Sequence, residues 1–80
     1  MVKKDGFEFL KSTRQNKKYM VRVNNKLVHF GDKRYEHYKD KIGLYKNLDH
    51  GDINRKKAYY ARHGKAEKYS PKWFSHNYLW

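Results

Sequence analysis

KYMVRVNNKLVHF, residues 18–30, has the clearest secondary-structure pattern in this chain. β-Branched and aromatic residues alternate with polar ones on both sides of Asn24 and Asn25, which is typical of two strands joined by a two-residue turn. Asparagine suits such a turn because it tolerates positive φ angles. The turn sets the register, and the pairs that share one face are Val23 with Lys26, Val21 with Val28, and Tyr19 with Phe30. Most of these side chains are apolar, so we expect this face to pack on the core.

The sequence outside this hairpin predicts one further strand and three helices. FEFLKS, residues 7–12, also alternates, and the polar stretch TRQNKK can turn it back onto the hairpin. We therefore predict one small α+β domain over residues 1–80, in which helices pack on a three-stranded antiparallel meander. The predicted strands are about 7–13, 18–23 and 26–30, and the predicted helices are about 33–40, 52–63 and 71–78.

Capping residues locate the predicted helices. Asp32 can cap the first helix, and Asp49 or Asp52 can cap the second, because a carboxylate accepts hydrogen bonds from the free N–H groups at a helix start. Ser70 followed by Pro71 is a strong start signal for the third helix. On the second helix we expect an inner side made of Ile53, Ala58, Tyr60 and Ala61, and an outer side made of Arg55, Lys56, Tyr59, Arg62 and His63.

Positive charge dominates the chain. Twenty Lys and Arg residues stand against eight Asp and Glu, which gives a formal net charge of +12 at pH 7. A small compact domain with this surplus repels itself and attracts polyanions, and strong basicity is a common property of nucleic-acid-binding domains. Aromatic residues make up 18% of the chain, and rings between cations can stack on bases. A domain this small also needs most of its rings in the core.

The sequence contains no cysteine and no long apolar run. Disulfides, thiolate metal sites and thiol nucleophiles are therefore excluded, and we expect no membrane-spanning segment. The absence of disulfides favours a reducing, intracellular setting. The sequence shows no Gly-rich phosphate loop, and we expect no cofactor.

Cations on the predicted hairpin, the following loop and the second helix form the candidate nucleic-acid interface. Lys and Arg side chains neutralise phosphates and release counterions, so such a surface binds the backbone with little preference for sequence. The candidate residues are Arg14, Lys17, Lys18, Arg22, Lys26, Lys33, Arg34, Arg55, Lys56, Tyr59 and Arg62. Two alternatives stay open for these charges: an evenly spread solvated coat, and favourable contacts with a helix C-terminus.

Motifs for catalysis and metal binding are weak in this sequence. The chain has five histidines, and their spacing matches no zinc-ligand motif. Asp49 and Asp52 could hold a divalent cation for a nuclease reaction, but a turn that leads into a helix cap explains them better. We therefore expect a binding protein with no bound metal and no enzymatic activity, and we keep a metal-dependent nuclease as the third hypothesis.

Four segments of the chain, taken in order, carry a resemblance to a known family. They are KSTR..KKYMVRV (11–23), KLVHFGD.RYEHYKD (26–40), LDHGD..RK.AYYARHGK (48–65) and YSPKWFSHNYLW (69–80). The chain resembles a family of small basic proteins of unknown function that are encoded by tailed phages and large DNA viruses of eukaryotes. The resemblance implies a viral gene product, associated with the virion or acting on viral DNA. The chain departs from the family pattern at Asn25, where glycine is expected, and this affects only the turn type.

Nucleic-acid binding is the leading expectation, with DNA favoured over RNA as the partner, in the virion or inside the host cell. The alternative is a minor virion or capsid-associated protein, or an inhibitor that docks on an acidic host protein. That alternative requires an exposed apolar patch, which we would expect around Trp73, Phe74 and Trp80.

Overall fold

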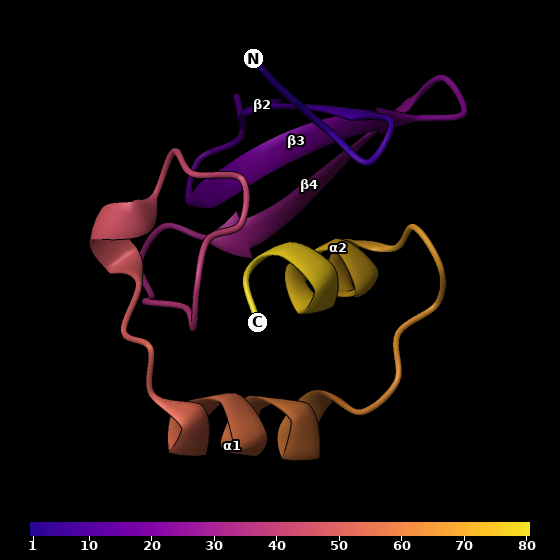
Figure 1. Cartoon of the computed structure of the whole chain (residues 1–80). Helices are drawn as coiled ribbons and strands as arrows, with labels where there is room; N and C mark the ends of the chain where they lie inside the picture. The colour runs from indigo at the N-terminus through magenta and orange to yellow at the C-terminus, as the bar shows by residue number, and fades with distance from the viewer.

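The fold is a four-stranded antiparallel sheet with two α-helices, as the computed structural model of residues 1–80 shows (Figure 1). The strands are β1 (Val2–Lys4), β2 (Phe7–Lys11), β3 (Lys17–Val23) and β4 (Lys26–Asp32), in that order across the sheet. A short 3₁₀-helix, η1 (Lys46–Leu48), precedes α1 (Ile53–His63) and α2 (Pro71–Tyr78). α2 lies against the sheet, whereas α1 lies beyond α2 and farther from the strands. The predicted α+β class is confirmed.

The β3–β4 hairpin has the predicted register. The pairs are Tyr19 with Phe30, Val21 with Val28, and Val23 with Lys26. Asn24 and Asn25 have φ angles of 48° and 66°, so both central residues adopt the left-handed conformation of a type I′ turn. β4 continues beyond residue 30 as far as Asp32, which pairs with Lys17.

The predicted number of strands is wrong, because a fourth strand precedes the other three. Asp5 and Gly6 have φ angles of 54° and 82° and form a second two-residue turn, which pairs Val2–Lys4 with β2. Asp-Gly between two alternating segments is itself a strong hairpin signal, so the sequence contained the information for this strand. β2 ends before residue 13, because the Ser12 hydroxyl accepts a hydrogen bond from the Arg14 backbone N–H and starts a turn.

The predicted helix over residues 33–40 is absent, and an irregular loop takes its place. The Asp32 carboxylate does not cap a helix, because it accepts hydrogen bonds from the Arg34 backbone N–H and guanidinium and so fixes a turn. Farther along, His37 forms an isolated parallel bridge with Asp49. These contacts satisfy the polar groups of the segment outside a helix.

Both other helices begin and end near the predicted residues. Asp52 caps α1 by accepting hydrogen bonds from two backbone N–H groups of the first turn, and Gly64 follows the helix with a φ angle of 62°. Ser70 caps α2 by accepting a hydrogen bond from the Trp73 backbone N–H, and proline occupies the first turn. These local capping contacts are the ones that the sequence predicted.

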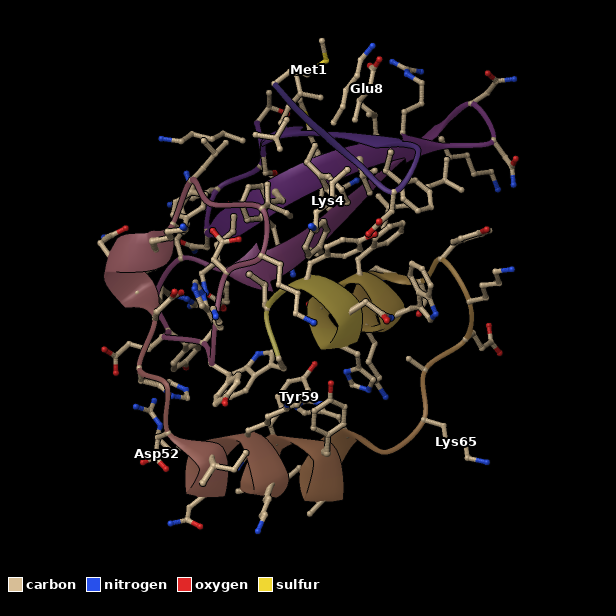
Figure 2. All side chains as sticks on the ribbon, in the orientation of Figure 1. Met1, Lys4, Glu8, Asp52, Tyr59 and Lys65 are labelled. Carbon is tan, nitrogen blue, oxygen red and sulfur yellow. The ribbon has the colours of Figure 1, made fainter.

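The predicted inner side of α1 is wrong for three of its four residues, and only Tyr60 is half-buried, with its hydroxyl donating to the His76 carbonyl. Ile53 is 48% exposed, and Ala58 and Ala61 are exposed as well. Tyr59, on the predicted outer side, is only 6% exposed, and Figure 2 shows its side chain directed away from α1 toward α2. The Tyr59 ring stacks on the Trp80 ring with centroids 4.3 Å apart, and a ring buries far more apolar area than an alanine does.

Aromatic rings make most of the core between the sheet and α2. The buried hydrophobic residues that form it are Phe9, Tyr19, Val21, Phe30, Ile42, Phe74, Tyr78 and Leu79. Phe74 of α2 packs edge-on against Phe7 and stacks with Phe30, at centroid distances of 5.2 and 5.5 Å. The C-terminal segment therefore closes over the sheet, as predicted. None of the helices has both the length and the apolar character needed to cross a lipid bilayer.

Candidate nucleic-acid interface

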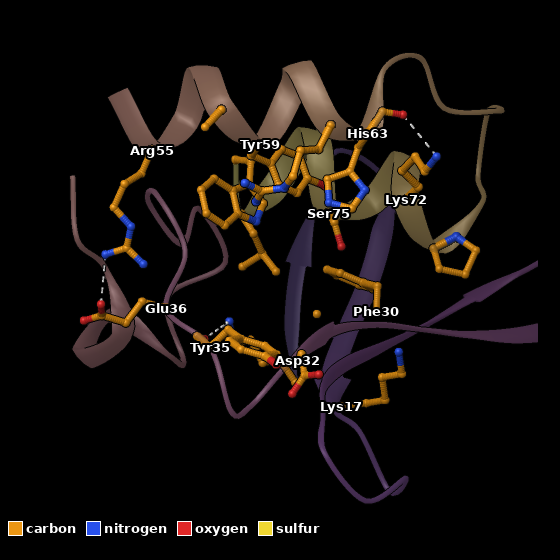
Figure 3. Close-up of a pocket in the computed structure, with 17 residues that line it drawn as sticks. Lys17, Phe30, Asp32, Tyr35, Glu36, Arg55, Tyr59, His63, Lys72 and Ser75 are labelled. Atoms are coloured by element: carbon orange, nitrogen blue, oxygen red, sulfur yellow. Dashed lines mark hydrogen bonds and ion pairs between the residues drawn. The ribbon is translucent and has the colours of Figure 1, made fainter. Parts of the chain in front are cut away.

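A cavity lies between α1, α2 and the end of β4 (Figure 3), and we call it the α1 cavity. Its volume of about 600 Å³ falls within the range of small-molecule binding sites. Figure 3 shows Tyr59 and His63 on the α1 side, with Tyr35 and Asp32 on the opposite side. Because the walls come from segments far apart in the sequence, only the folded chain forms this cavity.

Basic side chains dominate the charge of the α1 cavity. Five lysines and arginines line it, and they are Lys17, Lys18, Arg55, Arg62 and Lys72. Only two acids line it, and each is engaged by an arginine: Asp32 by Arg34 at 2.7 Å, and Glu36 by Arg55 at 3.0 Å. The hydrogen bonds from Arg34 lower the pKa of Asp32 to about 2. Lys17 and Arg62 form no ion pair, so both can meet an external anion.

Aromatic rings line the same cavity. Tyr59 stacks face to face on Trp80 with an interplanar angle of 7°, and its hydroxyl shares a hydrogen bond with His76 Nδ1 at 2.8 Å. Burial raises the pKa of Tyr59 to about 12, so the hydroxyl stays protonated at neutral pH. Tyr35 is 64% exposed, and the Arg34 guanidinium lies 5.8 Å from the centre of its ring. Tyr59 is buried against Trp80, so Tyr35 is the ring of this cavity with a largely exposed face. A cavity with cations and an exposed ring can bind phosphate and base together.

Lys18 lies behind the cavity surface and is only 2% exposed. Its ammonium donates to the Tyr35 carbonyl at 2.9 Å and to His37 Nδ1 at 2.8 Å. Because an ammonium can only donate, Nδ1 accepts and the proton of neutral His37 sits on Nε2, 2.6 Å from Asp49 Oδ1. Burial lowers the pKa of Lys18 to about 8, and burial followed by the nearby ammonium lowers the pKa of His37. The Lys18 ammonium is therefore committed to internal hydrogen bonds.

The structure distributes the predicted interface residues over several places. The α1 cavity brings together Lys17, Lys18, Arg55, Tyr59 and Arg62. Exposed in loops at the Lys17 end of the sheet are Arg14, Lys33 and Arg34. Exposed at the opposite end, beside the β3–β4 turn, are Arg22 and Lys26. Lys56 lies on α1, and its ammonium is 4.6 Å from the centre of the Tyr38 ring.

Comparison with known families places the chain in one of them. A family model matches residues 7–63, which is well over half of the chain. The protein belongs to the family of unknown function DUF5754. The expected membership of a family of unknown function is thereby confirmed, and no curated protein or solved structure is detectably similar to the chain.

The DUF5754 match covers β2 to α1, whereas α2 lies outside the matched residues. α2 contributes Lys72 to the α1 cavity, and Trp80, two residues after the end of α2, contributes an aromatic ring. Neither residue belongs to the predicted interface, because each reaches the cavity only when α2 packs on the sheet. Tyr35 is also missing from the predicted interface. Its position next to Arg34 was a local indication that a ring and a cation lie together at the site.

His63 also lines the cavity of this DUF5754 protein, although it is not among the predicted interface residues. Its ring centre lies 4.4 Å from that of Tyr59, and its carbonyl accepts a hydrogen bond from the Lys72 ammonium at 3.1 Å. Burial, and then the positive charges of Lys72 and Arg62, lower the pKa of His63. At neutral pH this imidazole is therefore uncharged and offers both a donor and an acceptor.

Asp49 and Asp52 both have structural partners in the fold. Asp49 accepts hydrogen bonds from His37 and, at 2.8 Å, from the Asp40 backbone N–H, while Asp52 caps α1. No group of three or more His, Cys, Asp or Glu side chains is placed to hold a metal ion. The two carboxylates thus have the turn and capping contacts that the sequence favoured for them.

The apolar patch that a docking function requires is not found at its predicted position. Phe74 is fully buried, and Trp73 and Trp80 are half-buried. The large hydrophobic residues that are exposed come from separate segments, and they are Met1, Leu27, Tyr35, Leu44 and Ile53. The three rings of the predicted patch instead pack within the monomer.

Proposed function

We propose that this protein binds nucleic acid through the phosphate backbone, with little sequence specificity. The observation that carries the proposal is the composition of the α1 cavity, where cations from separate elements meet beside the exposed ring of Tyr35. These cations are Lys17, Arg55, Arg62 and Lys72. Like charges that converge in this way repel each other in the free protein, and a polyanion relieves the repulsion.

Two further features support contact with the backbone. The exposed Arg14, Lys33 and Arg34 extend the positive surface from the cavity along the adjacent end of the sheet. No asparagine or glutamine lines the cavity, and these are the side chains that bind adenine edges in pairs of hydrogen bonds. Contacts to phosphates position a protein on nucleic acid without reading sequence.

The resemblance of the sequence to small basic viral proteins favours DNA over RNA as the partner. Our proposal therefore includes a viral origin, with the protein acting on viral DNA in the virion or inside the host cell. A binding role without catalysis is part of the same proposal, since the site is explained by charge and stacking.

A salt titration tests the proposal. The affinity for a short fluorescent DNA is measured by anisotropy at several salt concentrations, and log Kd is plotted against log salt. Each neutralised phosphate contributes about 0.9 to the slope, so three to five contacts predict a slope of magnitude about 3–5. Arg62→Gln should reduce this magnitude by about 1, whereas Lys3→Gln, at an exposed position of β1 outside the α1 cavity, should leave it unchanged. A flat dependence on salt, or no binding in dilute buffer, would refute electrostatic binding.

A further inference from the structure

We propose that the α1 cavity is a binding site for one unstacked nucleotide, so that the protein prefers single-stranded DNA to continuous duplex. This inference rests on the proposed nucleic-acid binding and specifies the form of nucleic acid. It goes further than backbone contact, because it assigns the rings of the cavity to a base and its cations to the flanking phosphates.

The size of the cavity is the first argument. The cavity has a volume of about 600 Å³ and opens to solvent, since eight of its 17 lining residues are exposed, so a ligand can enter it directly. A single base with its sugar is a ligand of the class that such sites hold. A base inside a duplex is stacked and paired, and it reaches a cavity only after it is turned out of the helix.

The rings are the second argument. The half-buried Trp80 stacks one face on the buried Tyr59, and the largely exposed Tyr35 lies across the cavity from Tyr59 (Figure 3), so Trp80 and Tyr35 are the rings a base can reach. Base stacking on aromatic side chains tolerates any base, since every base has a π-face. His63, uncharged at neutral pH and beside Tyr59, adds one donor and one acceptor for a base edge.

The positions of the cations are the third argument. Figure 3 shows Lys17 and Lys72 on one side of the cavity and Arg55 on the other. A strand that crosses the cavity would therefore meet a positive charge on each side of the inserted base, where its phosphates lie. Glu36 holds Arg55 at 3.0 Å in the free protein, and exposed ion pairs of this kind are weak enough for a phosphate to compete.

Tryptophan fluorescence provides the test. Trp73→Phe leaves Trp80 as the single tryptophan, and Trp73 is not a cavity residue. This protein is titrated with a single-stranded oligothymidylate and with a blunt duplex of equal phosphate content at one salt concentration. We expect the single strand to bind at least tenfold more tightly and to quench Trp80, whereas the duplex binds without quenching.

The Tyr35→Ala variant tests whether the Tyr35 side of the cavity contacts the base. The side chain is exposed, and the Tyr35 carbonyl that Lys18 uses belongs to the backbone, so the fold should persist. The variant should lose most of the preference for single strands while its affinity for duplex and its salt slope stay unchanged. Leu27→Ala, at an exposed position outside the cavity, is the matched control and should behave as the parent protein.

Each result bears on a different claim. Equal affinities for the two DNA forms, or a Tyr35→Ala protein that keeps the full preference, would overturn the nucleotide site while leaving salt-dependent binding in place. Failure to bind either form would instead overturn the proposed function, and the nucleotide site with it.

Discussion

Asp40 is a buried carboxylate that organises the loop between β4 and α1. It is 1% exposed, and its two oxygens accept hydrogen bonds from the backbone N–H groups of Ile42, Gly43 and Tyr45 and from the Tyr19 hydroxyl. Four donors around one carboxylate replace the hydration that it loses on burial. The Asp40 side chain thus provides hydrogen-bond acceptors for the backbone N–H groups of this loop, as neighbouring strands do for one another in the sheet.

Replacing this carboxylate should be costly. Asp40→Asn keeps the shape, but whichever oxygen the amide NH₂ replaces, it then faces at least one backbone N–H that can only donate, so we expect a loss of about 2–3 kcal/mol in the free energy of unfolding. Urea denaturation measures the loss. Asp52→Asn is the matched control, because asparagine caps a helix as well as aspartate does, and it should cost no more than about 0.5 kcal/mol. Equal losses in the two variants would contradict the role of Asp40.

His37 couples the fold to pH. Its pKa is lowered in the folded state, so the unfolded chain takes up a proton near pH 6.5 that the folded protein resists. Since the unfolded state then binds more protons, stability falls as pH drops below about 6.5 and is retained above it. The other histidines with lowered pKa values act in the same direction, and they are His29, His50 and His63.

His37→Gln should weaken this dependence on pH. The glutamine amide can accept from Lys18 and donate to Asp49, but it does not titrate. Urea denaturation between pH 7 and about pH 5 should show a smaller loss of stability in the variant than in the natural protein. Parallel pH profiles for the two proteins would show that His37 does not carry the effect.

At the scale of elements, Gly31 determines how β4, β3 and α2 meet. Its φ angle is +76°, and a Cβ atom there would lie 2.9 Å from Leu79 Cδ1 and 3.1 Å from Lys18 Cβ. Both a left-handed backbone and close packing therefore require glycine at this point of β4. Gly6, in the β1–β2 turn, has a φ angle of +82°, but a Cβ atom there would meet nothing within 4 Å.

The two glycines provide a matched comparison. Gly6→Ala should cost about 1 kcal/mol from backbone strain alone. Gly31→Ala adds overpacking against the helix segment and should cost about 2–4 kcal/mol in total. Chemical denaturation of both variants tests this difference. Similar costs would mean that the contact of Leu79 with Gly31 adapts easily.

At the scale of the whole molecule, the net charge of +12 opposes the compact state. Salt screens this repulsion, so we expect the melting temperature to rise between about 50 and 500 mM NaCl, by roughly 4–8 °C for each 1 kcal/mol relieved. Affinity for nucleic acid should change in the opposite direction over the same range. Thermal unfolding followed by circular dichroism measures the first effect.

A charge-reduced variant is the control for this prediction. Arg22→Glu with Lys26→Glu lowers the net charge from +12 to +8, since each substitution removes two charges, and both sites are exposed at the far end of the hairpin. The variant should show a smaller rise in melting temperature with salt. An equal rise in both proteins would point to a salt effect unrelated to net charge.

Features that depend on contacts between near neighbours could be predicted from the sequence. The register of the β3–β4 hairpin follows from the Asn24-Asn25 turn, and the starts of α1 and α2 follow from Asp52 and Ser70, because each contact spans only a few residues. The β1–β2 turn at Asp5 and Gly6 belongs to the same class, although the prediction overlooked it. The surplus of positive charge is likewise a property of composition.

Contacts between side chains that are distant in sequence depend on long-range packing and could not be predicted from local patterns. The loop over residues 33–40 replaces a helix because His37 and Asp40 bond to segments that local patterns do not indicate. Tyr59 faces inward because Trp80, distant in sequence, offers a ring to stack on. The α1 cavity exists for the same reason: its charges and rings converge only after long-range packing, whose energy depends on partners that no short stretch of sequence contains.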